Sequence, residues 1–262
     1  QDPGRLEDEA LTIAQLNHPN IVSLYDVLSD DQAIYLIMEL LEGQPLSRFL
    51  SPKVPLERLA DLADLIDPDS PEILQQDVRT IQNKWLSKIG LAVANALEYA
   101  HSRGVYHRDV KPANIVITND RMVKLLDFSI ARKQSQTDGR TATGVVFGTV
   151  AYMSPEQVLT EPVDNRTDVY ALGCTLFHAA TGRTPYRAES DIKICMSHVN
   201  DPVPDPRLVN PVVSDALGGI IVKCMQKSKE DRFQSAAAVA EAIEAAIHGT
   251  DIPGVTIPVE KP

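Results

Sequence analysis

The order of hydrophobic and polar residues predicts a helix and a β-hairpin at the start of the chain. Over residues 5–16, apolar side chains recur at helical spacing opposite an acidic face. Two apolar runs follow at 21–28 and 33–41, joined by a polar turn over 29–32, which predicts an antiparallel hairpin. Residues 42–45 break the pattern, and we interpret them as a connection between two lobes.

The middle of the chain combines an irregular acidic segment with a clear helical repeat. Residues 51–83 contain four prolines and many acidic residues, with a helical patch at 56–66. We interpret this segment as a surface insertion whose role the sequence does not assign. Residues 84–103 carry apolar side chains at every third or fourth position, and Gly104 is well placed to end the predicted helix.

Two short strands precede a helical second half of the chain. Residues 115–117 and 123–126 predict the strands, and a polar stretch with few apolar residues covers 133–143. In residues 249–262, prolines and glycines replace any periodicity, so this end is interpreted as a linker or tail. The helices predicted between these segments cover residues 169–181, 191–200, 213–226 and 236–246.

Composition narrows the class of protein. The chain has 262 residues, 44% of them hydrophobic, which is enough to bury a substantial core in one or two lobes. The net charge of -11 disfavours nucleic acid as a partner, because an acidic surface repels phosphate backbones. No apolar run approaches the roughly 18 residues that a membrane span needs, and no signal-peptide pattern is present. The three cysteines are isolated and fit neither a zinc site nor a disulfide framework. We therefore expect a cytoplasmic protein, or the cytoplasmic part of a longer membrane-anchored one.

One short stretch concentrates residues suited to phosphoryl transfer. Asp109, Lys111 and Asn114 lie between the predicted central helix and the short hairpin, and Asp127 follows that hairpin. Two oxygen ligands brought together by a hairpin suit Mg²⁺, which proteins hold through one or two groups besides substrate phosphates. The lysine can neutralise charge on a transferring phosphoryl group, and the other aspartate can accept a hydroxyl proton.

These residues stand in a pattern that is similar to a known family. The stretch His107-Arg108-Asp109-Val110-Lys111-Pro112-Ala113-Asn114, followed by Asp127-Phe128-Ser129, resembles the catalytic loop and metal-binding segment of protein kinases. Among protein kinases, these motifs most resemble those of bacterial kinases of the eukaryotic-like serine/threonine class. Further matches follow the family's order at 9–22, 35–39, 148–149, 154–156, 168–173 and 231–233.

The resemblance implies an α+β, protein-kinase-like fold of two lobes. The N-lobe would be incomplete and cover residues 1–42, where the hairpin residues Ile21, Leu24, Ile34 and Leu36 would have half their expected packing partners. The C-lobe would be mostly helical and cover 43–248, with an insertion at about 51–83, and 249–262 would form the linker or tail.

The resemblance also implies ATP and Mg²⁺ as cofactors and assigns catalytic roles. Asp109 would orient the substrate hydroxyl and take its proton, and Lys111 would lie beside the γ-phosphate. Asn114 and Asp127 would hold Mg²⁺. Lys111 and Thr149 favour serine or threonine over tyrosine as the acceptor in a protein substrate.

The adenine would be bound where the hairpin leads into the connection between the lobes. Main-chain groups of Glu39 and Leu41 would bond the base, and Met38 would lie at the back of the pocket. Val116 would pack against the base from below.

Other matches imply structural roles. Ile13, Leu24, His107 and Phe128 would stack into an apolar column that links the lobes, and Asp168 would cap the catalytic loop from the core. Glu156 and Arg232 would form a buried ion pair.

The polar stretch holds Thr141 and Thr143, where this family is often phosphorylated. Arg108 would pair with a phosphate there, because a phosphothreonine adds about two negative charges and three acceptor oxygens. The alternative is that these threonines are solvated loop residues.

Two departures from the family pattern bear on activity. No G-x-G-x-x-G loop or strand lysine precedes Glu9, so the ATP phosphates would lose one of their main contacts. This is consistent with a truncated kinase, a chain completed by another segment, or a degenerate kinase. Ser129 stands where the family nearly always has glycine, and its Cβ disfavours some backbone angles. We expect altered switching of Phe128, with Asp127 still able to bind metal.

Three functional hypotheses remain. The first is ATP-dependent phosphoryl transfer to protein serine or threonine, since Asp109, Lys111, Asn114 and Asp127 are all present. The second is a pseudokinase that acts as a binding or scaffold module, which the missing phosphate loop favours. A small-molecule kinase is less consistent with the activation-segment matches.

Overall fold

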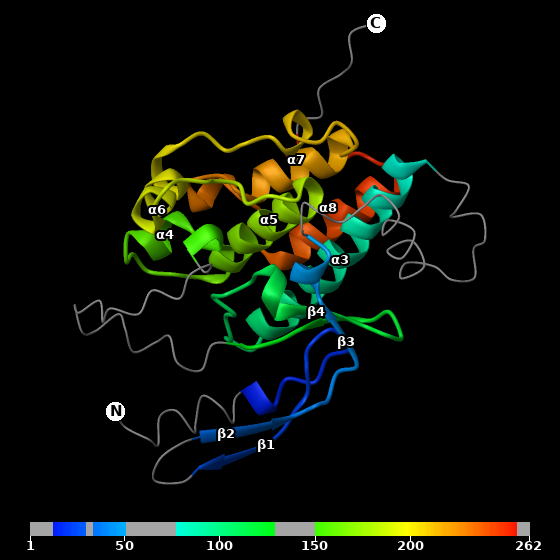
Figure 1. The fold of residues 1–262 in the computed structure, drawn as a ribbon, viewed down its shortest axis with the longest axis vertical. Helices are drawn as coiled ribbons and strands as arrows, with labels where there is room; N and C mark the ends of the chain where they lie inside the picture. Colours follow the sequence, from blue (N-terminus) through cyan, green and yellow to red (C-terminus); the bar gives the residue numbers. More distant parts are fainter. Residues whose placement is uncertain (1–12, 30–33, 51–76, 129–149, 256–262) are drawn as a thin grey trace, which may run out of the picture.

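The long helix α3 (Val78–His101) is central to the fold, with α5 (Asn165–Thr181) and α8 (Ala236–His248) packed along it and a β-hairpin beyond one end (Figure 1). The structure is a computed structural model and describes residues 13–29, 34–50, 77–128 and 150–255. Predictions for the insertion over 51–76 and for residues Glu9, Ser129, Thr141, Thr143 and Thr149 lie outside the described residues.

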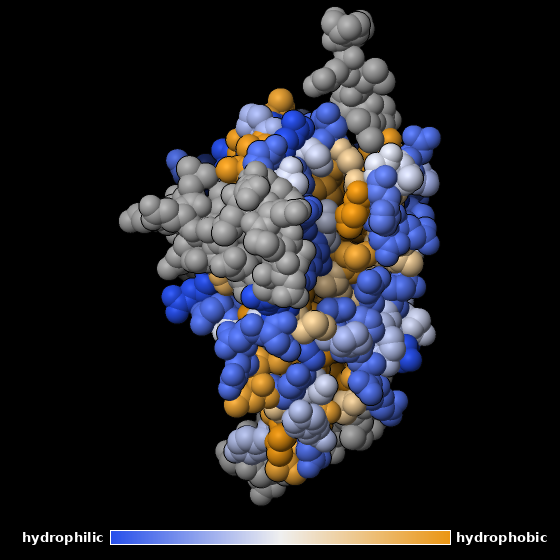
Figure 2. Space-filling view, turned by 90° about the vertical axis from the view of Figure 1, so that its right-hand side faces the viewer, coloured by the Kyte–Doolittle hydropathy of each residue, from blue (hydrophilic) through white to orange (hydrophobic). Residues whose placement is uncertain are grey.

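The predicted hairpin is confirmed. Strands β1 (Leu24–Ser29) and β2 (Ile34–Met38) pair antiparallel, with an irregularity between Leu24 and Asp26. Within the described residues this sheet has two strands, and hydrophobic side chains such as Leu28 and Ile37 stay exposed. Figure 2 shows this hydrophobic surface at the lower end of the molecule, at the height of the hairpin. The hairpin therefore buries little apolar surface of its own.

The missing packing predicted for the hairpin applies to some residues only. Leu36 is 36% exposed and Leu24 is half-buried, whereas Ile21 is only 1% exposed. Ile21 forms an isolated parallel bridge with Leu125, and Leu125 N donates to Asn20 O at 2.8 Å. The predicted loss of packing was therefore wrong for Ile21, because main-chain contacts with Leu125 hold the chain before β1 against the C-lobe.

A second small sheet underlies the region between the lobes. Strands β3 (Gly43–Pro45), β4 (Ile115–Thr118) and β5 (Val123–Leu125) pair antiparallel in the order β3-β4-β5. The sequence predicted β4 and β5 but interpreted 42–45 only as a connection. That interpretation missed β3, where Gly43 runs so close to the Ile117 carbonyl that a Cβ would collide with it.

The C-lobe is helical, as predicted, with some changes of bounds. Helix α3 begins at Val78 rather than at residue 84, because the Asp77 side chain caps it by accepting from Thr80 N at 2.7 Å. The other α-helices in the described part of the chain are α4 (Pro155–Val158), α5 (Asn165–Thr181), α6 (Asp191–Asn200), α7 (Asp215–Cys224) and α8 (Ala236–His248). Short 3-10 turns occur at Leu46–Arg48, Pro112–Asn114, Val150–Tyr152, Pro206–Leu208 and Lys229–Asp231.

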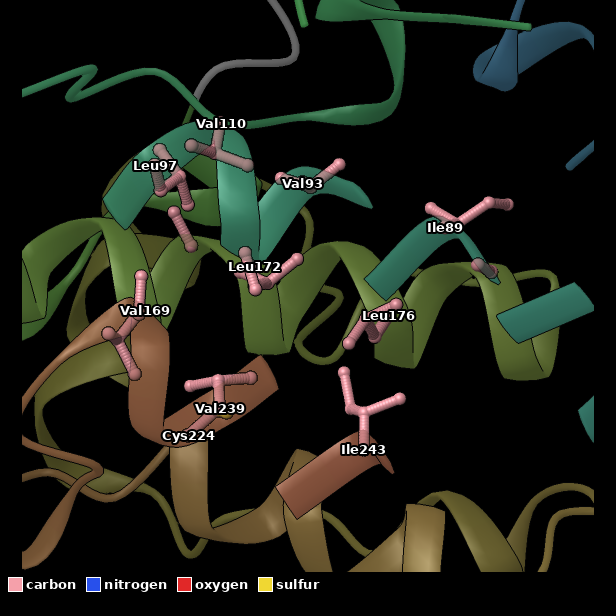
Figure 3. Packing of buried hydrophobic residues seen from close by; sticks show 14 of the residues in the cluster. Ile89, Val93, Leu97, Val110, Val169, Leu172, Leu176, Cys224, Val239 and Ile243 are labelled. Carbon is pink, nitrogen blue, oxygen red and sulfur yellow. The ribbon is translucent and has the colours of Figure 1, made fainter. Parts of the chain in front are cut away.

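The main hydrophobic core lies where α3, α5 and α8 meet (Figure 3). Ile89 of α3, Leu176 of α5 and Ile243 of α8 are each at most 2% exposed and belong to one cluster. Val110, which directly follows Asp109 in the chain, is also fully buried in this cluster. The core therefore anchors the segment that carries the candidate catalytic aspartate.

The described end of the chain remains in contact with the C-lobe. Gly249 ends α8 with a left-handed backbone, and Ile252 beyond it is 6% exposed and belongs to the core. Across the described parts of the sequence, none of the helices combines the length and apolar character that crossing a membrane requires.

Candidate active site

The candidate site lies where the loop after α3 meets the segment after β5. Leu126 N donates to Asn114 O at 2.8 Å, which joins the two segments through the main chain. The Asn114 side chain donates to Asp109 O at 2.9 Å. The structure thus brings together the backbone segments that carry Asp109, Asn114 and Asp127.

Asp109 and Lys111 form a close ion pair at this site. Lys111 Nζ lies 2.7 Å from Asp109 Oδ2, and the two side chains are 19% and 16% exposed, respectively. Asn114 Nδ2 makes a longer contact of 3.4 Å with the same oxygen. Because both charged groups keep access to solvent, they can meet a substrate hydroxyl and a phosphate.

The loop before Asp109 is held by Asp168, which lies on α5 and is fully buried. Asp168 Oδ2 accepts from His107 N at 2.8 Å, and Oδ1 accepts from Arg108 N at 2.6 Å. His101 Nε2 also lies 2.8 Å from Oδ2. Burial alone would raise the pKa of Asp168, but the hydrogen bond and charge of His101, with the loop contacts, outweigh it and hold the pKa below its usual value. The predicted cap from the core is confirmed.

His107 is a neutral link between the two segments. Its Nδ1 accepts from Asp109 N at 3.2 Å, so Nε2 carries the proton and donates to Leu126 O at 2.7 Å. Burial lowers the pKa of His107, and nearby Asp168 opposes that shift only in part. The His107 ring packs on Phe128 with 4.7 Å between centroids, which confirms this part of the predicted apolar column. The other two residues of the predicted column, Ile13 and Leu24, are both half-buried.

The candidate adenine-binding residues lie at the end of β2 and on β4. Met38 ends β2 and is 37% exposed, Leu41 is half-buried, and Val116 on β4 is 9% exposed. Val116 pairs directly with Lys124 of β5 in the sheet register. Val116 and Glu39, which directly follows β2, are therefore both neighbours of Lys124.

That lysine fixes Glu39. Lys124 Nζ donates to Glu39 Oε2 at 3.0 Å, and Ser23 N donates to the same oxygen at 3.1 Å. Glu39 N in turn donates to Ser23 O at 2.9 Å. Burial alone would raise the pKa of Glu39, but Lys124 and Ser23 more than compensate and lower it. Both the main chain and the side chain of Glu39 are thus held in place.

Three residues around the site were missed by the sequence interpretation. His101 supports Asp168, Lys124 fixes Glu39, and Gln157 donates to Arg108 O at 3.0 Å. Only Gln157 carries a local signal, because Ser154 and Gln157 form a capping-box pattern. The others depend on contacts between distant parts of the chain.

Asn114 and Asp127 have donor atoms that fit Mg²⁺. The Asn114 amide uses its nitrogen to donate to Asp109 O, which leaves the amide oxygen as the group for a cation. The Asp127 carboxylate is exposed. One carboxylate and one amide oxygen match the oxygen preference of Mg²⁺. No group of three or more His, Cys, Asp or Glu suited to a metal occurs among the residues that the structure describes.

Glu156 and Arg232 form the predicted ion pair beneath the site. Arg232 Nη1 and Nη2 each lie 2.8 Å from one Glu156 oxygen, and the side chains are at most 2% exposed. Arg232 also donates to three main-chain carbonyls, those of Gln226, Arg166 and Lys227. This fully paired guanidinium joins α4 to the chain before α8.

Comparison with known proteins identifies the family of this chain. A family model described as "Protein kinase domain" matches residues 1–243. A probable serine/threonine-protein kinase of Clostridium acetobutylicum is 34% identical over 234 residues, covering 88% of this chain and 31% of that protein. The serine/threonine-protein kinase PknB of Mycobacterium leprae is 35% identical over 245 residues, covering 90% of this chain and 35% of that protein. The chain spans about a third of the length of these relatives.

Solved structures show the same fold. The kinase domain of PknI from Mycobacterium tuberculosis superposes with a TM-score of 0.63 at 26% identity, covering 92% of this chain and 77% of that one. Rad53 1-466 in complex with AMP-PNP superposes with a TM-score of 0.66 at 22% identity, covering 96% and 55%, and supports the fold alone.

The chain has the fold of protein kinases and belongs to the protein kinase domain family. Its relatives are serine/threonine-protein kinases of bacteria, which confirms the family recognised from the sequence.

Proposed function

We propose that this chain transfers the γ-phosphoryl group of ATP to serine or threonine in protein substrates. The observation that carries the proposal is that Asp109, Lys111 and Asn114 lie together on a loop held by buried Asp168, next to the segment that carries Asp127. A phosphoryl-transfer site needs positioned groups and charge stabilisation more than covalent chemistry by the protein. This loop provides positioned groups.

Each residue has a role that follows from its place. Asp109 accepts the proton of the substrate hydroxyl, while Lys111, 2.7 Å from it, supplies positive charge beside the transferred group. Asn114 and Asp127 would hold Mg²⁺, which when bound neutralises charge on the phosphates. Because Asn114 also donates to Asp109 O, the same side chain orients the aspartate.

The nucleotide base would lie between β2 and β4. Glu39 and Leu41 offer main-chain groups for the adenine, Met38 lines the back, and Val116 forms the floor. The support for this proposal is the fixed position of Glu39, whose side chain and main chain are both bonded to Ser23.

A second candidate is a kinase-like chain that binds partners without phosphoryl transfer. The 262 residues contain no G-x-G-x-x-G loop, which covers the ATP phosphates in active kinases, so phosphoryl transfer by these residues alone has to be measured. The two candidates share the fold and differ in turnover.

Label transfer from γ-labelled ATP to a basic protein separates these candidates. The chain is assayed with Mg²⁺ beside its Asp109→Asn variant, which keeps the size of the side chain. Incorporation that is lost in the variant supports the kinase. If both proteins incorporate only the same background of label, phosphoryl transfer is rejected and the binding module becomes the supported function.

Further proposals concern regulation and location. Phosphorylation of Thr141 or Thr143 by the chain itself would place a phosphate for Arg108 to bind, which mass spectrometry after incubation with ATP tests directly. The expected setting remains the cytoplasm, and protein rather than nucleic acid remains the expected partner.

A further inference from the structure

We propose that Gln157 is a positioning residue that sets the orientation of Asp109 through the main chain of Arg108. This inference rests on the proposed function, because it concerns the residue assigned as the proton acceptor. Gln157 lies on α4, outside the catalytic loop, and contacts that loop by a single side-chain hydrogen bond from Nε2 to Arg108 O at 3.0 Å.

The orientation of the Gln157 amide is fixed by the start of its own helix. Ser154 N donates to Gln157 Oε1 at 3.0 Å, and Gln157 N donates to Ser154 Oγ at 3.3 Å. This reciprocal capping box commits the amide oxygen to the helix terminus. The amide nitrogen, which can only donate, therefore faces the Arg108 carbonyl.

The peptide that Gln157 holds is the one directly before Asp109. Arg108 has a φ of 63°, a left-handed conformation that a residue with a Cβ adopts only when its surroundings impose it. Three bonds impose it here. Asp168 Oδ1 accepts from Arg108 N at 2.6 Å, and His107 Nδ1 accepts from Asp109 N at 3.2 Å. Gln157 supplies the third bond, at the carbonyl between those two amides.

These bonds fix the plane of the peptide between Arg108 and Asp109 at both its polar atoms. The oxygen is held by Gln157 and the N–H by His107. Since that plane sets the direction in which the Asp109 Cα–Cβ bond leaves the chain, its rotation would turn the carboxylate away from Lys111 and Asn114. Small errors in the position of a reacting group reduce the rate of a positioned reaction strongly.

Gln157 also connects the loop to the segment before α4. The turn Val150–Tyr152 and the cap residue Ser154 immediately precede α4, and Glu156 beside Gln157 is anchored by Arg232. Gln157 is thus a contact by which the position of this segment acts on the catalytic loop. If Gln157 only stabilised the start of α4, its bonds to Ser154 would suffice and the bond to Arg108 O would have no effect on catalysis.

A substitution separates the two roles. Gln157→Glu keeps an acceptor oxygen for Ser154 N, because glutamate serves equally well at this place in a capping box. An ionised glutamate cannot donate to Arg108 O and brings negative charge toward that carbonyl. The matched control is Ser154→Ala, which removes the side-chain cap and keeps the amide that holds Arg108.

The test compares wild type, Gln157→Glu, Ser154→Ala and Asp109→Asn in steady-state phosphoryl transfer and thermal unfolding. We expect Gln157→Glu to lower kcat by about tenfold while KM for ATP stays within about twofold, since the base-binding residues are untouched. Ser154→Ala should lower the melting temperature and leave kcat near that of wild type. Wild-type kcat in Gln157→Glu would overturn the proposal, and so would an equal loss in both variants.

Amide hydrogen exchange keeps this test separate from that of the proposed function. If wild type transfers no more label than Asp109→Asn, the proposed function fails and exchange over residues 107–111 decides the inference. Faster exchange there in Gln157→Glu than in Ser154→Ala and wild type supports the positioning role. Unchanged exchange in Gln157→Glu refutes it.

Discussion

Breaking the buried pair between Glu156 and Arg232 should be among the most damaging single changes in the C-lobe. Glu156→Gln keeps the shape of the side chain but leaves the Arg232 guanidinium without its counter-charge, at a site where both side chains are at most 2% exposed. Removing one partner of a buried pair costs about 3–5 kcal/mol, because the remaining charge stays desolvated. The three carbonyls that Arg232 also contacts hold it in place, so it cannot escape to water.

Urea unfolding measures this loss. With a slope of roughly 2 kcal/mol per molar urea, a loss of about 3–5 kcal/mol moves the midpoint down by roughly 1.5–2.5 M. The control is Glu189→Gln, which breaks the pair between Lys193 of α6 and Glu189 just before that helix, where the side chains are 64% and 90% exposed. An exposed pair contributes little, so its midpoint should not move measurably.

The pH dependence adds a second criterion. Burial alone would raise the pKa of Glu156, but the hydrogen bonds and charge of Arg232 hold it below the ordinary value of 4.5. A lowered folded-state pKa gives stability that is fully present above the unfolded pKa and is lost as pH falls through the folded one. The difference between wild type and Glu156→Gln should therefore be largest near neutral pH and shrink in acid below about 4.5. A midpoint shift no larger than that of the control, or one independent of pH, would refute the reasoning.

Three other predictions concern the site and its supports. Lys124→Met should raise KM for ATP several-fold with little change in kcat, because it frees Glu39 at the proposed adenine site; unchanged KM in steady-state kinetics would contradict this. Asp168→Asn should lower kcat and also the melting temperature, since an amide cannot accept all three bonds and an unsatisfied buried donor costs about 1–3 kcal/mol. Gly173→Ala should lower the melting temperature, because the new Cβ would lie 2.6 Å from Cys224 Cβ and overpacking costs about 1–3 kcal/mol; an unchanged thermal unfolding curve would argue against it.

The sequence predicted those parts of the fold that local pattern determines. The period of apolar residues placed α6 at its observed bounds, and the alternation of apolar runs and polar turns found both hairpins. It missed the first turns of α3, where Gln82 and Asn83 bond to Ala180 O and Val212 O in distant elements. Polar residues that serve tertiary contacts weaken the periodic signal.

The same limit applies to the site. Ordered motifs located Asp109, Asn114 and Asp127, because these residues lie in two short segments whose spacing is recognisable. Nothing in the local sequence indicated that Lys124 would reach Glu39, since that contact requires the chain just after β2 to lie next to β5 in space. The left-handed backbone of Arg108 could not be predicted from the local sequence either, because hydrogen bonds with Asp168 and Gln157 impose it.

The most direct test of the account is to identify the amino acid that receives the label from γ-labelled ATP. A basic protein is incubated with the chain and Mg²⁺, hydrolysed, and its phosphoamino acids are separated, with Asp109→Asn in parallel. The account predicts phosphoserine or phosphothreonine that disappears in the variant. Phosphotyrosine, or label that persists without the Asp109 carboxylate, would contradict it.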